Sequence, residues 1–312
     1  MIPAHLKGHD FLRVNDWAPD ELVLVLDHAD RLKARQRERV PHRLLEGRNF
    51  GMIFQKPSTR TRVSFEVGIA QLGGTGLYLA AGDLQLGRGE TIRDTATVLS
   101  RYLDGIMIRT FAQADVDELA EHADIPVING LTDDFHPCQA LADVMTIRER
   151  LGGFEGVRVA YLGDGNNVCH SLLVACAKLG LDFVAATPPG YEPSEEVVGW
   201  ARAAAKANGT AVELTDDPRA AATGADVLYT DVWTSMGQEG ERERRVADLA
   251  GYGIDADLVA LASERAIVLH CLPAHYGEEI TEDVLYGERS AVWDQAENRL
   301  HAQKALMALV IR

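Results

Sequence analysis

The sequence contains few cysteines, no long hydrophobic segment and fewer basic than acidic residues. Its four cysteines, in 312 residues, are too sparse for a disulfide framework and form no C-x-x-C pair, which is typical of a reducing compartment. No apolar run approaches the roughly 20 residues that a bilayer span requires. The first residues, MIPAHLKGHDFLRVNDW, carry charges and lack an apolar h-region. We therefore expect neither a signal peptide nor a membrane anchor, and a cytoplasmic location.

The formal net charge of −16 argues against nucleic acid and anionic membrane as partners, because both require a concentrated positive surface. An anionic small molecule would need a locally positive pocket in so acidic a protein. The candidates to build one are Arg60, Arg62, Arg109 and Arg299. The stretch 238–248 is charged but mixed in sign, which usually indicates a solvated loop or helix face.

A metal site is not expected from this sequence. His270, Cys271 and His275 could in principle supply zinc ligands. Their spacing matches no structural zinc pattern, however, and no second cluster completes it. The sequence therefore predicts no bound metal.

Short apolar runs alternate with helical patterns along the whole chain, which is typical of parallel sheets with crossover helices. The pattern predicts an α/β protein of two similar domains, each a mainly parallel sheet of four or five strands flanked by helices. The expected strands of the first half are 49–54, 76–81, 104–110 and 125–130. Those of the second half are 157–163, 182–187, 211–214, 226–231 and 266–270.

The segment Ser58-Thr59-Arg60-Thr61-Arg62 joins the first expected strand to a helix that keeps Val63, Val67 and Ala70 on one face. At a helix N-terminus the backbone N–H groups lack intrahelical partners and the dipole favours negative charge. A phosphate could there accept hydrogen bonds from N–H groups, hydroxyls and a guanidinium together. An N-cap followed by surface arginines is the simpler reading, but two hydroxyls interleaved with two arginines exceed what a cap needs.

Four motifs together resemble the aspartate and ornithine carbamoyltransferase family. The segment FQKPSTRTRVSFE is similar to its carbamoyl phosphate loop, and His136-Pro137-Cys138-Gln139 fits its His-Pro-x-Gln element. The segments 231–237, DVWTSMG, and 270–273, HCLP, match the ornithine branch. The motifs occur in the family's order and cover most of the chain. Gln55 is a departure, since ornithine enzymes often carry glutamate there, but it flanks the loop.

The resemblance implies transfer of the carbamoyl group of carbamoyl phosphate to the side-chain amine of L-ornithine, giving L-citrulline and phosphate without a cofactor. It implies that Arg109, His136, Asp231 and Cys271 are catalytic. The implied carbamoyl phosphate ligands are Ser58, Thr59, Arg60, Thr61, Gln85, Arg109, His136, Gln139, Cys271, Leu272 and Arg299. The implied ornithine ligands are Asn167, Asp231, Ser235 and Met236.

Several of these residues also have ordinary structural interpretations when each is taken alone. Arg109 could be a strand-end arginine in a salt bridge, and His136 could be a turn residue. Cys271 at a strand end is normally a packing residue, and Arg299 could lie exposed on a helix. Cys138, at the variable position of its motif, is expected to pack in the core.

The resemblance also implies a domain organisation and an assembly. Residues 1–147 would form a carbamoyl phosphate-binding domain, completed by a terminal helix over 297–312, and residues 148–296 would form an ornithine-binding domain. In relatives the loop equivalent to that of Gln85 reaches a neighbouring subunit's active site. A homotrimer, or a multiple of trimers, with shared sites is therefore expected, although a surface loop without a role is the simpler reading of the loop alone.

Three other functions fit the sequence less well. A nicotinamide-dependent dehydrogenase is disfavoured because Val168 replaces the third glycine of a G-x-G-x-x-G fingerprint in GDGNNVCHS. A binding protein without catalysis is disfavoured because each matched motif keeps its reactive side chain. A transferase for another amine such as putrescine is disfavoured by the Ser-Met-Gly sequence.

Overall fold

The computed structural model describes residues 4–84, 89–235, 237 and 239–312. Two compact units make up the chain. Unit 1 comprises residues 1–142 and 297–312, and unit 2 comprises residues 143–296. Among the described helices, none is long and apolar enough to cross a membrane.

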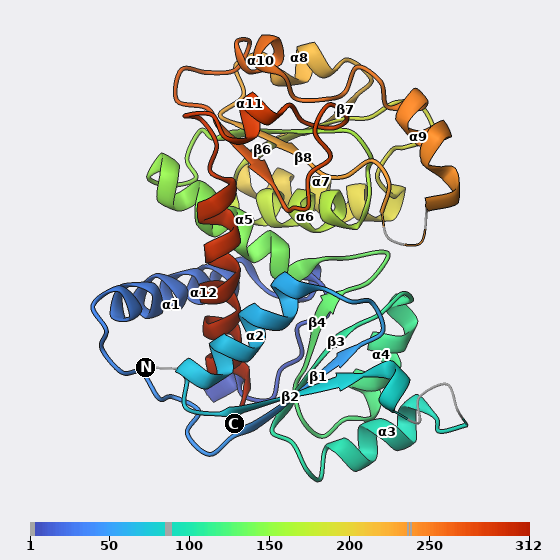
Figure 1. Ribbon diagram of the computed structural model, residues 1–312. Coiled ribbons are helices and arrows are strands. Elements are labelled where there is room, and N and C mark those ends of the chain that lie inside the picture. The colour runs from blue at the N-terminus through green and yellow to red at the C-terminus, as the bar shows by residue number, and fades with distance from the viewer. Residues whose placement is uncertain (1–3, 85–88, 236, 238) are drawn as a thin grey trace. The chain divides into compact units, whose positions relative to one another are not determined.

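Unit 1 is built on a four-stranded parallel sheet in the order β2-β1-β3-β4 (Figure 1). All four strands expected in the first half of the chain are confirmed. They are β1 (Asn49–Phe54), β2 (Thr75–Ala80), β3 (Gly105–Arg109) and β4 (Val127–Leu131). Strands β1 and β3 are buried almost throughout, as both faces of a parallel sheet are covered by helices.

Helices cover both faces of the unit 1 sheet. Side chains of β1, β3 and β4 pack with Ala96 of α3 and Val116 of α4 on one face. On the other face Phe50 stacks on Phe65 of α2, with ring centroids 5.8 Å apart. The helices are α1 (Pro19–Arg37), α2 (Thr59–Gln71), α3 (Ile92–Leu99) and α4 (Gln113–His122), with short 3₁₀ turns η1 (Ala4–Leu6), η2 (Val14–Asp16) and η3 (Ala81–Asp83).

The helix after the Ser58–Arg62 segment is confirmed, but its buried face is not the one that carries Val63 and Val67. Those two side chains are 49% and 38% exposed, whereas Phe65 and Ile69 are buried. Gly68 lies on the buried face, where a Cβ would come 3.1 Å from the Met307 side chain. Close approach of another helix therefore decides which face is covered.

Unit 2 is built on a five-stranded parallel sheet in the order β7-β6-β5-β8-β9. All five strands expected in the second half are confirmed. They are β5 (Arg158–Leu162), β6 (Asp182–Ala186), β7 (Val212–Thr215), β8 (Val227–Thr230) and β9 (Ile267–His270). Its helices are α6 (Asn167–Leu179), α7 (Glu195–Asn208), α8 (Pro218–Ala222), α9 (Arg242–Asp248), α10 (Ala256–Val259) and α11 (Glu282–Leu285), with the 3₁₀ turn η4 (Glu239–Glu241).

Two long helices contribute residues to both units. Helix α5 (Pro137–Leu151) begins in unit 1, and helix α12 (Val292–Val310) begins in unit 2. The terminal helix thus starts five residues earlier than the expected Glu297. The amide of Gln295 already donates to the Ala291 carbonyl at 2.9 Å, so helical hydrogen bonding includes the VWDQ segment.

The strand order of each sheet reverses at one point, and ligands of open α/β sheets bind at the carboxyl ends of the strands beside such a point. In unit 1 the reversal lies between β1, which leads into Ser58, and β3, which ends at Arg109. In unit 2 it lies between β5 and β8, which lead into Asn167 and Asp231. The topology therefore places the sequence motifs at the two positions where a ligand is expected.

Unit 1 also encloses a polar cluster around Lys304 of α12, which is fully buried. Its ammonium donates to Gln36 Oε1 at 2.6 Å and to Gln71 Oε1 at 2.8 Å, and lies 3.3 Å from His42 Nε2. Burial lowers the pKa of Lys304 to about 8. The charged form is thus held by neutral acceptors, which compensate its loss of hydration only in part.

We expect Lys304→Met to change how stability depends on pH. Burial of the charged Lys304 ammonium lowers the unfolding free energy. This loss of stability is fully present below pH 8 and disappears as pH rises toward the pKa of an unfolded lysine, about 10.4. The unfolding free energy of the unsubstituted protein should therefore rise relative to Lys304→Met by on the order of 2 kcal/mol between these limits. Urea unfolding at a series of pH values measures this difference. Lys206→Met, at an exposed position of α7, is the control and should show no such trend.

Candidate active site

The Ser58–Thr61 segment has the predicted helix-start geometry. Ser58 is the N-cap of α2, with φ −162°, and its hydroxyl accepts from the Thr61 amide at 3.2 Å. Thr59 and Arg60 are exposed and Thr61 is buried. The start of α2 therefore presents hydroxyls, N–H groups and the exposed guanidiniums of Arg60 and Arg62 beyond the end of β1.

The Thr61 hydroxyl accepts hydrogen bonds from cationic side chains of distant parts of unit 1. Its Oγ1 accepts from Arg109 Nη1 at 3.5 Å and from Arg299 Nη2 at 3.2 Å. Both arginines are buried, with 7% and 4% exposure. Arg299 is therefore not an exposed helix residue, and Arg109 lies at the end of β3 beside the phosphate-loop candidate.

His136 and Gln139 lie in the same region, at the start of α5. The Gln139 Oε1 accepts from Arg299 Nη1 at 2.7 Å. Burial, and then the positive charges of Arg299, Arg109 and Arg60, lower the pKa of His136 well below its ordinary value. The imidazole is therefore neutral at pH 7 and stands in the field of three guanidiniums, which together form an anion-binding arrangement.

Gln303 is a buried neighbour of this arrangement that the sequence analysis did not single out. With the side-chain amide assigned from its hydrogen-bond partners, Oε1 accepts from Arg299 Nη2 at 3.0 Å and from Arg299 Nε at 3.1 Å, and the amide nitrogen donates to Ser64 Oγ at 2.6 Å. Ser64 Oγ in turn donates to the Thr61 carbonyl at 3.1 Å. Gln303 thus connects the Arg299 guanidinium to α2. Its i+4 spacing from Arg299 was the one available sequence signal.

Cys138 is fully buried, as expected of a packing residue, and its thiol lies 3.4 Å from the Asn129 carbonyl oxygen. Burial raises the pKa of Cys138 to about 12, so the thiol stays protonated. A role as a nucleophile is therefore not indicated.

In unit 2, Asn166 connects the loop after β5 to Asp231. Its Oδ1 accepts from the Val168 and Cys169 amides at 2.9 and 3.2 Å, and its Nδ2 donates to Asp231 Oδ2 at 2.8 Å. Asn166 is the N-cap of α6, and Asn167 is the first residue of that helix. The cap already uses the N–H groups that a dinucleotide's pyrophosphate would need, which adds to the case against nicotinamide binding.

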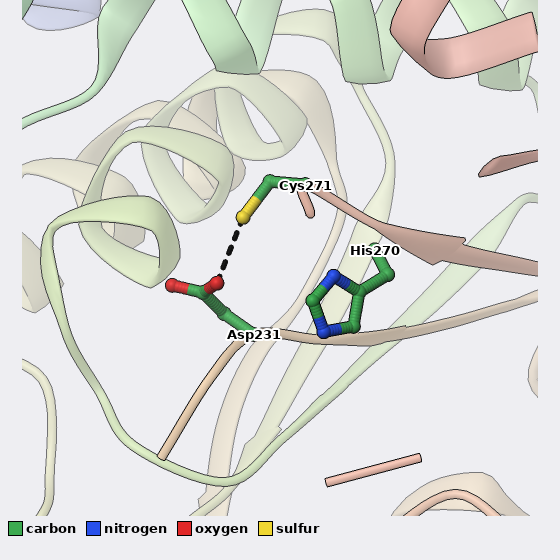
Figure 2. Close-up of side chains that lie close together, drawn as sticks. All are labelled: Asp231, His270 and Cys271. Carbon is green, nitrogen blue, oxygen red and sulfur yellow. Dashed lines mark hydrogen bonds between the residues drawn. The ribbon is translucent and has the colours of Figure 1, made fainter. Parts of the chain in front are cut away.

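Cys271 and Asp231 lie at the ends of neighbouring strands β9 and β8. The Cys271 thiol donates to Asp231 Oδ1 at 2.8 Å, and Figure 2 shows this contact with His270 beside it. Leu272 has φ +59°, a left-handed conformation that is strained for a bulky residue. Its amide donates to His270 Nδ1 at 2.8 Å. Strained backbone at a strand end is a feature of functional sites.

Arg245 of α9 belongs to the mixed-charge stretch 238–248, which the sequence predicts to be solvated. Its side chain is buried, donates from Nε to the Trp233 carbonyl at 2.5 Å, and forms an ion pair with Asp164. Burial raises the pKa of Asp164 to about 6, against the opposing effect of Arg245. Arg245 thus joins the loop after β5 to the loop after β8, and the reading of this stretch as wholly solvated was wrong at this residue.

Three of the residues predicted from the sequence to bind substrate have not yet been placed: Ser235, Gln85 and Met236. Ser235 is half-buried in the loop after β8, four residues beyond Asp231. Gln85 and Met236 lie outside the described residues. The described candidates thus form two sets, one around Thr61 and His136 in unit 1 and one around Asp231 and Cys271 in unit 2.

The chain is similar to known proteins over nearly its full length. The model of the "Aspartate/ornithine carbamoyltransferase, carbamoyl-P binding domain" matches residues 9–149. The model of the "Aspartate/ornithine carbamoyltransferase, Asp/Orn binding domain" matches residues 155–310. A Pyrococcus horikoshii protein named ornithine carbamoyltransferase is 57% identical over 306 residues, covering 98% of this chain and 96% of that protein.

Solved structures give the same result. That of ornithine carbamoyltransferase from Pyrococcus furiosus superposes with a TM-score of 0.96 at 57% identity, covering 98% of both chains. That from Thermus thermophilus superposes with a TM-score of 0.87 at 43% identity, covering 97% of this chain and 99% of the other. With motifs, topology, family models and relatives in agreement, this chain belongs to the aspartate/ornithine carbamoyltransferase family.

Proposed function

We propose that the protein transfers the carbamoyl group of carbamoyl phosphate to the side-chain amine of L-ornithine, giving L-citrulline and phosphate. The observation that carries this proposal is the convergence of Arg60, Arg109 and Arg299 on the neutral His136, beside the start of α2. A dianionic phosphate ester suits such a cluster, and so acidic a protein has no general excess of positive charge to offer.

In unit 1 we assign the phosphate group to Ser58, Thr59, Arg60, Thr61, Arg109 and Arg299, with Gln85 as a further ligand. Arg109 also reaches the carbamoyl oxygen in this proposal. The neutral His136 donates its N–H to that oxygen, and Gln139 holds the carbamoyl amide. These donors stabilise the negative charge that develops on the oxygen when the amine attacks. The family model's description of this region as a carbamoyl-P binding domain supports the assignment.

In unit 2 we assign ornithine to Asn167, Asp231, Ser235 and Met236. Asn167, at the first turn of α6, suits the α-carboxylate, because its side-chain amide can donate a hydrogen bond and the helix dipole favours negative charge at that end. Asp231 suits a cationic amino group. Cys271 and the Leu272 backbone contact the side-chain amine and the carbamoyl group. The Cys271 thiol already donates to Asp231, which places sulfur and carboxylate at one point.

The chemistry then needs no cofactor. The neutral side-chain nitrogen attacks the carbamoyl carbon, a C–N bond forms, the C–O bond to phosphate breaks, and the proton lost by nitrogen ends on phosphate. Since phosphate is a good leaving group, the protein's contribution is orientation and charge stabilisation. The proposal is tested by incubating purified protein with carbamoyl phosphate and ornithine. Citrulline and phosphate should form in equal amounts, and phosphate release without citrulline would contradict it.

Arg245 should act on ornithine binding without touching the substrate. Because it joins the loops that carry Asn167 and Asp231, we expect Arg245→Met to raise the KM for ornithine by about tenfold or more, with a smaller effect on the KM for carbamoyl phosphate. Protonation of Asp164 breaks the same ion pair, so the KM for ornithine should also rise as pH falls through about 6.

Initial-rate kinetics at varied ornithine and pH measures both effects. The matched control is Arg244→Met, because Arg244 lies next in the chain, is 65% exposed at its side chain and pairs with the exposed Glu241. Equal changes in the two variants would show that net charge, and not the connection between the loops, sets the KM.

We propose further that the protein assembles as a homotrimer, or a multiple of trimers, with active sites shared between subunits. Unit 1 presents apolar side chains on its edge strand β2 and on α2, with Leu77 40% and Val63 49% exposed. An exposed apolar edge strand is a surface that proteins normally cover.

We also propose that the protein is cytoplasmic. Its four cysteines, Cys138, Cys169, Cys176 and Cys271, are free thiols, which suits a reducing compartment.

Sedimentation should give a mass of three 34.1 kDa subunits or a multiple of three. Leu77→Asp should lower that mass and the activity together, because it places a charge in the proposed interface. Leu214→Asp is the matched control, since Leu214 is 37% exposed on β7, the edge strand of the other sheet. A trimer that survives Leu77→Asp but not Leu214→Asp would place the interface elsewhere.

A further inference from the structure

A tight turn follows the Cys271–Leu272 segment in unit 2. The Gly277 amide donates to the Ile280 carbonyl at 3.0 Å, and the Glu278 amide donates to the His275 carbonyl at 3.1 Å. The turn gathers His275, Glu278 and Glu279 so that one ligand atom of each lies within 4.8 Å of the others. The group is distinct from the residues assigned to either substrate.

Glu279 is the central member of this group and is fully buried. Its Oε1 lies 3.1 Å from His270 Nε2 and accepts from the His275 amide at 2.6 Å. Because Leu272 N–H donates to His270 Nδ1, the neutral ring carries its proton on Nε2 and donates it to Glu279. One carboxylate oxygen is therefore fully engaged.

The other carboxylate oxygen of Glu279, Oε2, differs from Oε1 in its hydrogen bonding. Among the described residues, Oε2 is buried and accepts no hydrogen bond, and the same holds for Glu278 Oε2 and His275 Nδ1. Glu279 Oε2 lies 3.8 Å from His275 Nδ1, too far for a hydrogen bond. In the tautomer of His275 that carries its proton on Nε2, these are three buried acceptor atoms without a shared donor, which is costly, and a cation removes that cost.

The spacing of these atoms suits a small cation. Two ligands that each lie ~2.1 Å from a tetrahedral Zn²⁺ are separated by ~3.4 Å, which is close to the observed 3.8 Å. The three ligand atoms all lie within 4.8 Å of one another, so their closure on one ion requires only a small rotation. The side chains of His275 and Glu278 are 42% and 16% exposed, so they have room for it.

We propose that His275 Nδ1, Glu278 Oε2 and Glu279 Oε2 bind one divalent ion of the zinc class, with water completing the coordination. An imidazole with two carboxylates suits zinc or a related transition metal better than magnesium or calcium, which take oxygen ligands. Arg242 pairs with the other oxygen of Glu278 and leaves Oε2 for the ion. The ion is structural, since the transfer reaction needs no metal, and it stabilises the turn that follows Leu272.

The test uses the full-length protein, stripped with a chelator and then titrated with Zn²⁺ by calorimetry and with Co²⁺ by absorption spectroscopy. We expect one Zn²⁺ per chain and an increase in Tm on binding. His275→Ala and Glu278→Gln should each weaken binding at least tenfold. The controls Tyr276→Phe and Glu282→Gln, which change exposed neighbours, should bind as the unsubstituted protein does.

Asp231, His270 and Cys271 form a second group whose ligand atoms lie within 4.8 Å, and it is the rival site. The proposal expects unchanged Zn²⁺ affinity in Cys271→Ser and a Co²⁺ spectrum without a thiolate charge-transfer band. Binding that is lost in Cys271→Ser and kept in His275→Ala would overturn the proposal, and so would the absence of stoichiometric binding by the unsubstituted protein. Neither outcome depends on the transferase assignment, because the readouts are binding and stability.

Discussion

Arg60→Ala is expected to remove nearly all transferase activity and to leave the fold intact. Arg60 is exposed at the start of α2, and its charge contributes to the positive field at His136. A guanidinium that binds a transferring phosphate stabilises charge in a site from which the substrates exclude water, and loss of one such donor lowers kcat on the order of 10³-fold. An exposed arginine contributes little to stability, so the unfolding free energy should change by less than about 0.5 kcal/mol.

Steady-state kinetics and urea unfolding measure the two halves of this expectation. Arg43→Ala is the matched control, because it removes the same charge from unit 1 at a site where the side chain is 68% exposed and pairs with Glu46. Its activity should be close to that of the unsubstituted protein. If Arg60→Ala turned over normally, the phosphate would have to be assigned to other residues.

Ornithine is expected to be a far better substrate than putrescine. Putrescine has the same reach but lacks the α-carboxylate, so the donors at the start of α6 would remain without their partner. Sites built to hydrogen-bond a group reject analogues that lack it on the order of 10⁴-fold in kcat/KM. Asp231→Asn should weaken ornithine use much more than carbamoyl phosphate binding, because the variant keeps the shape of Asp231 and loses its charge.

Side-by-side assays with ornithine, putrescine and aspartate measure the preference. The rate should also rise with pH, about tenfold per unit, because only the neutral amine attacks and its pKa is near 10.4. No inflection from His136 is expected near pH 6.5, since its pKa is held well below that value. A preference for putrescine or aspartate would contradict the assignment of ornithine as the substrate. It would not affect the assignment of carbamoyl phosphate.

The short-range pattern of the sequence was enough to predict much of this fold. Nine apolar runs became nine parallel strands, because a strand buried on both faces needs a nearly continuous apolar segment. The N-cap at Ser58 was also predictable, since its geometry depends on residues three positions apart. The helix boundaries and the buried faces of the helices were less predictable from the sequence. The covered face of α2 depends on α12, more than 200 residues away in sequence.

The sequence by itself determined the two-sheet α/β architecture, the family and the motifs at the strand ends, because these depend on local periodicity and local residue order. Only the tertiary structure decided which charged residues are buried and what they contact. Arg245, Gln303, Lys304 and Glu279 look in sequence like ordinary polar residues of helices and turns. Each acquires its role from a partner brought close by folding, so burial and the resulting loss of hydration, and not residue type, make it important.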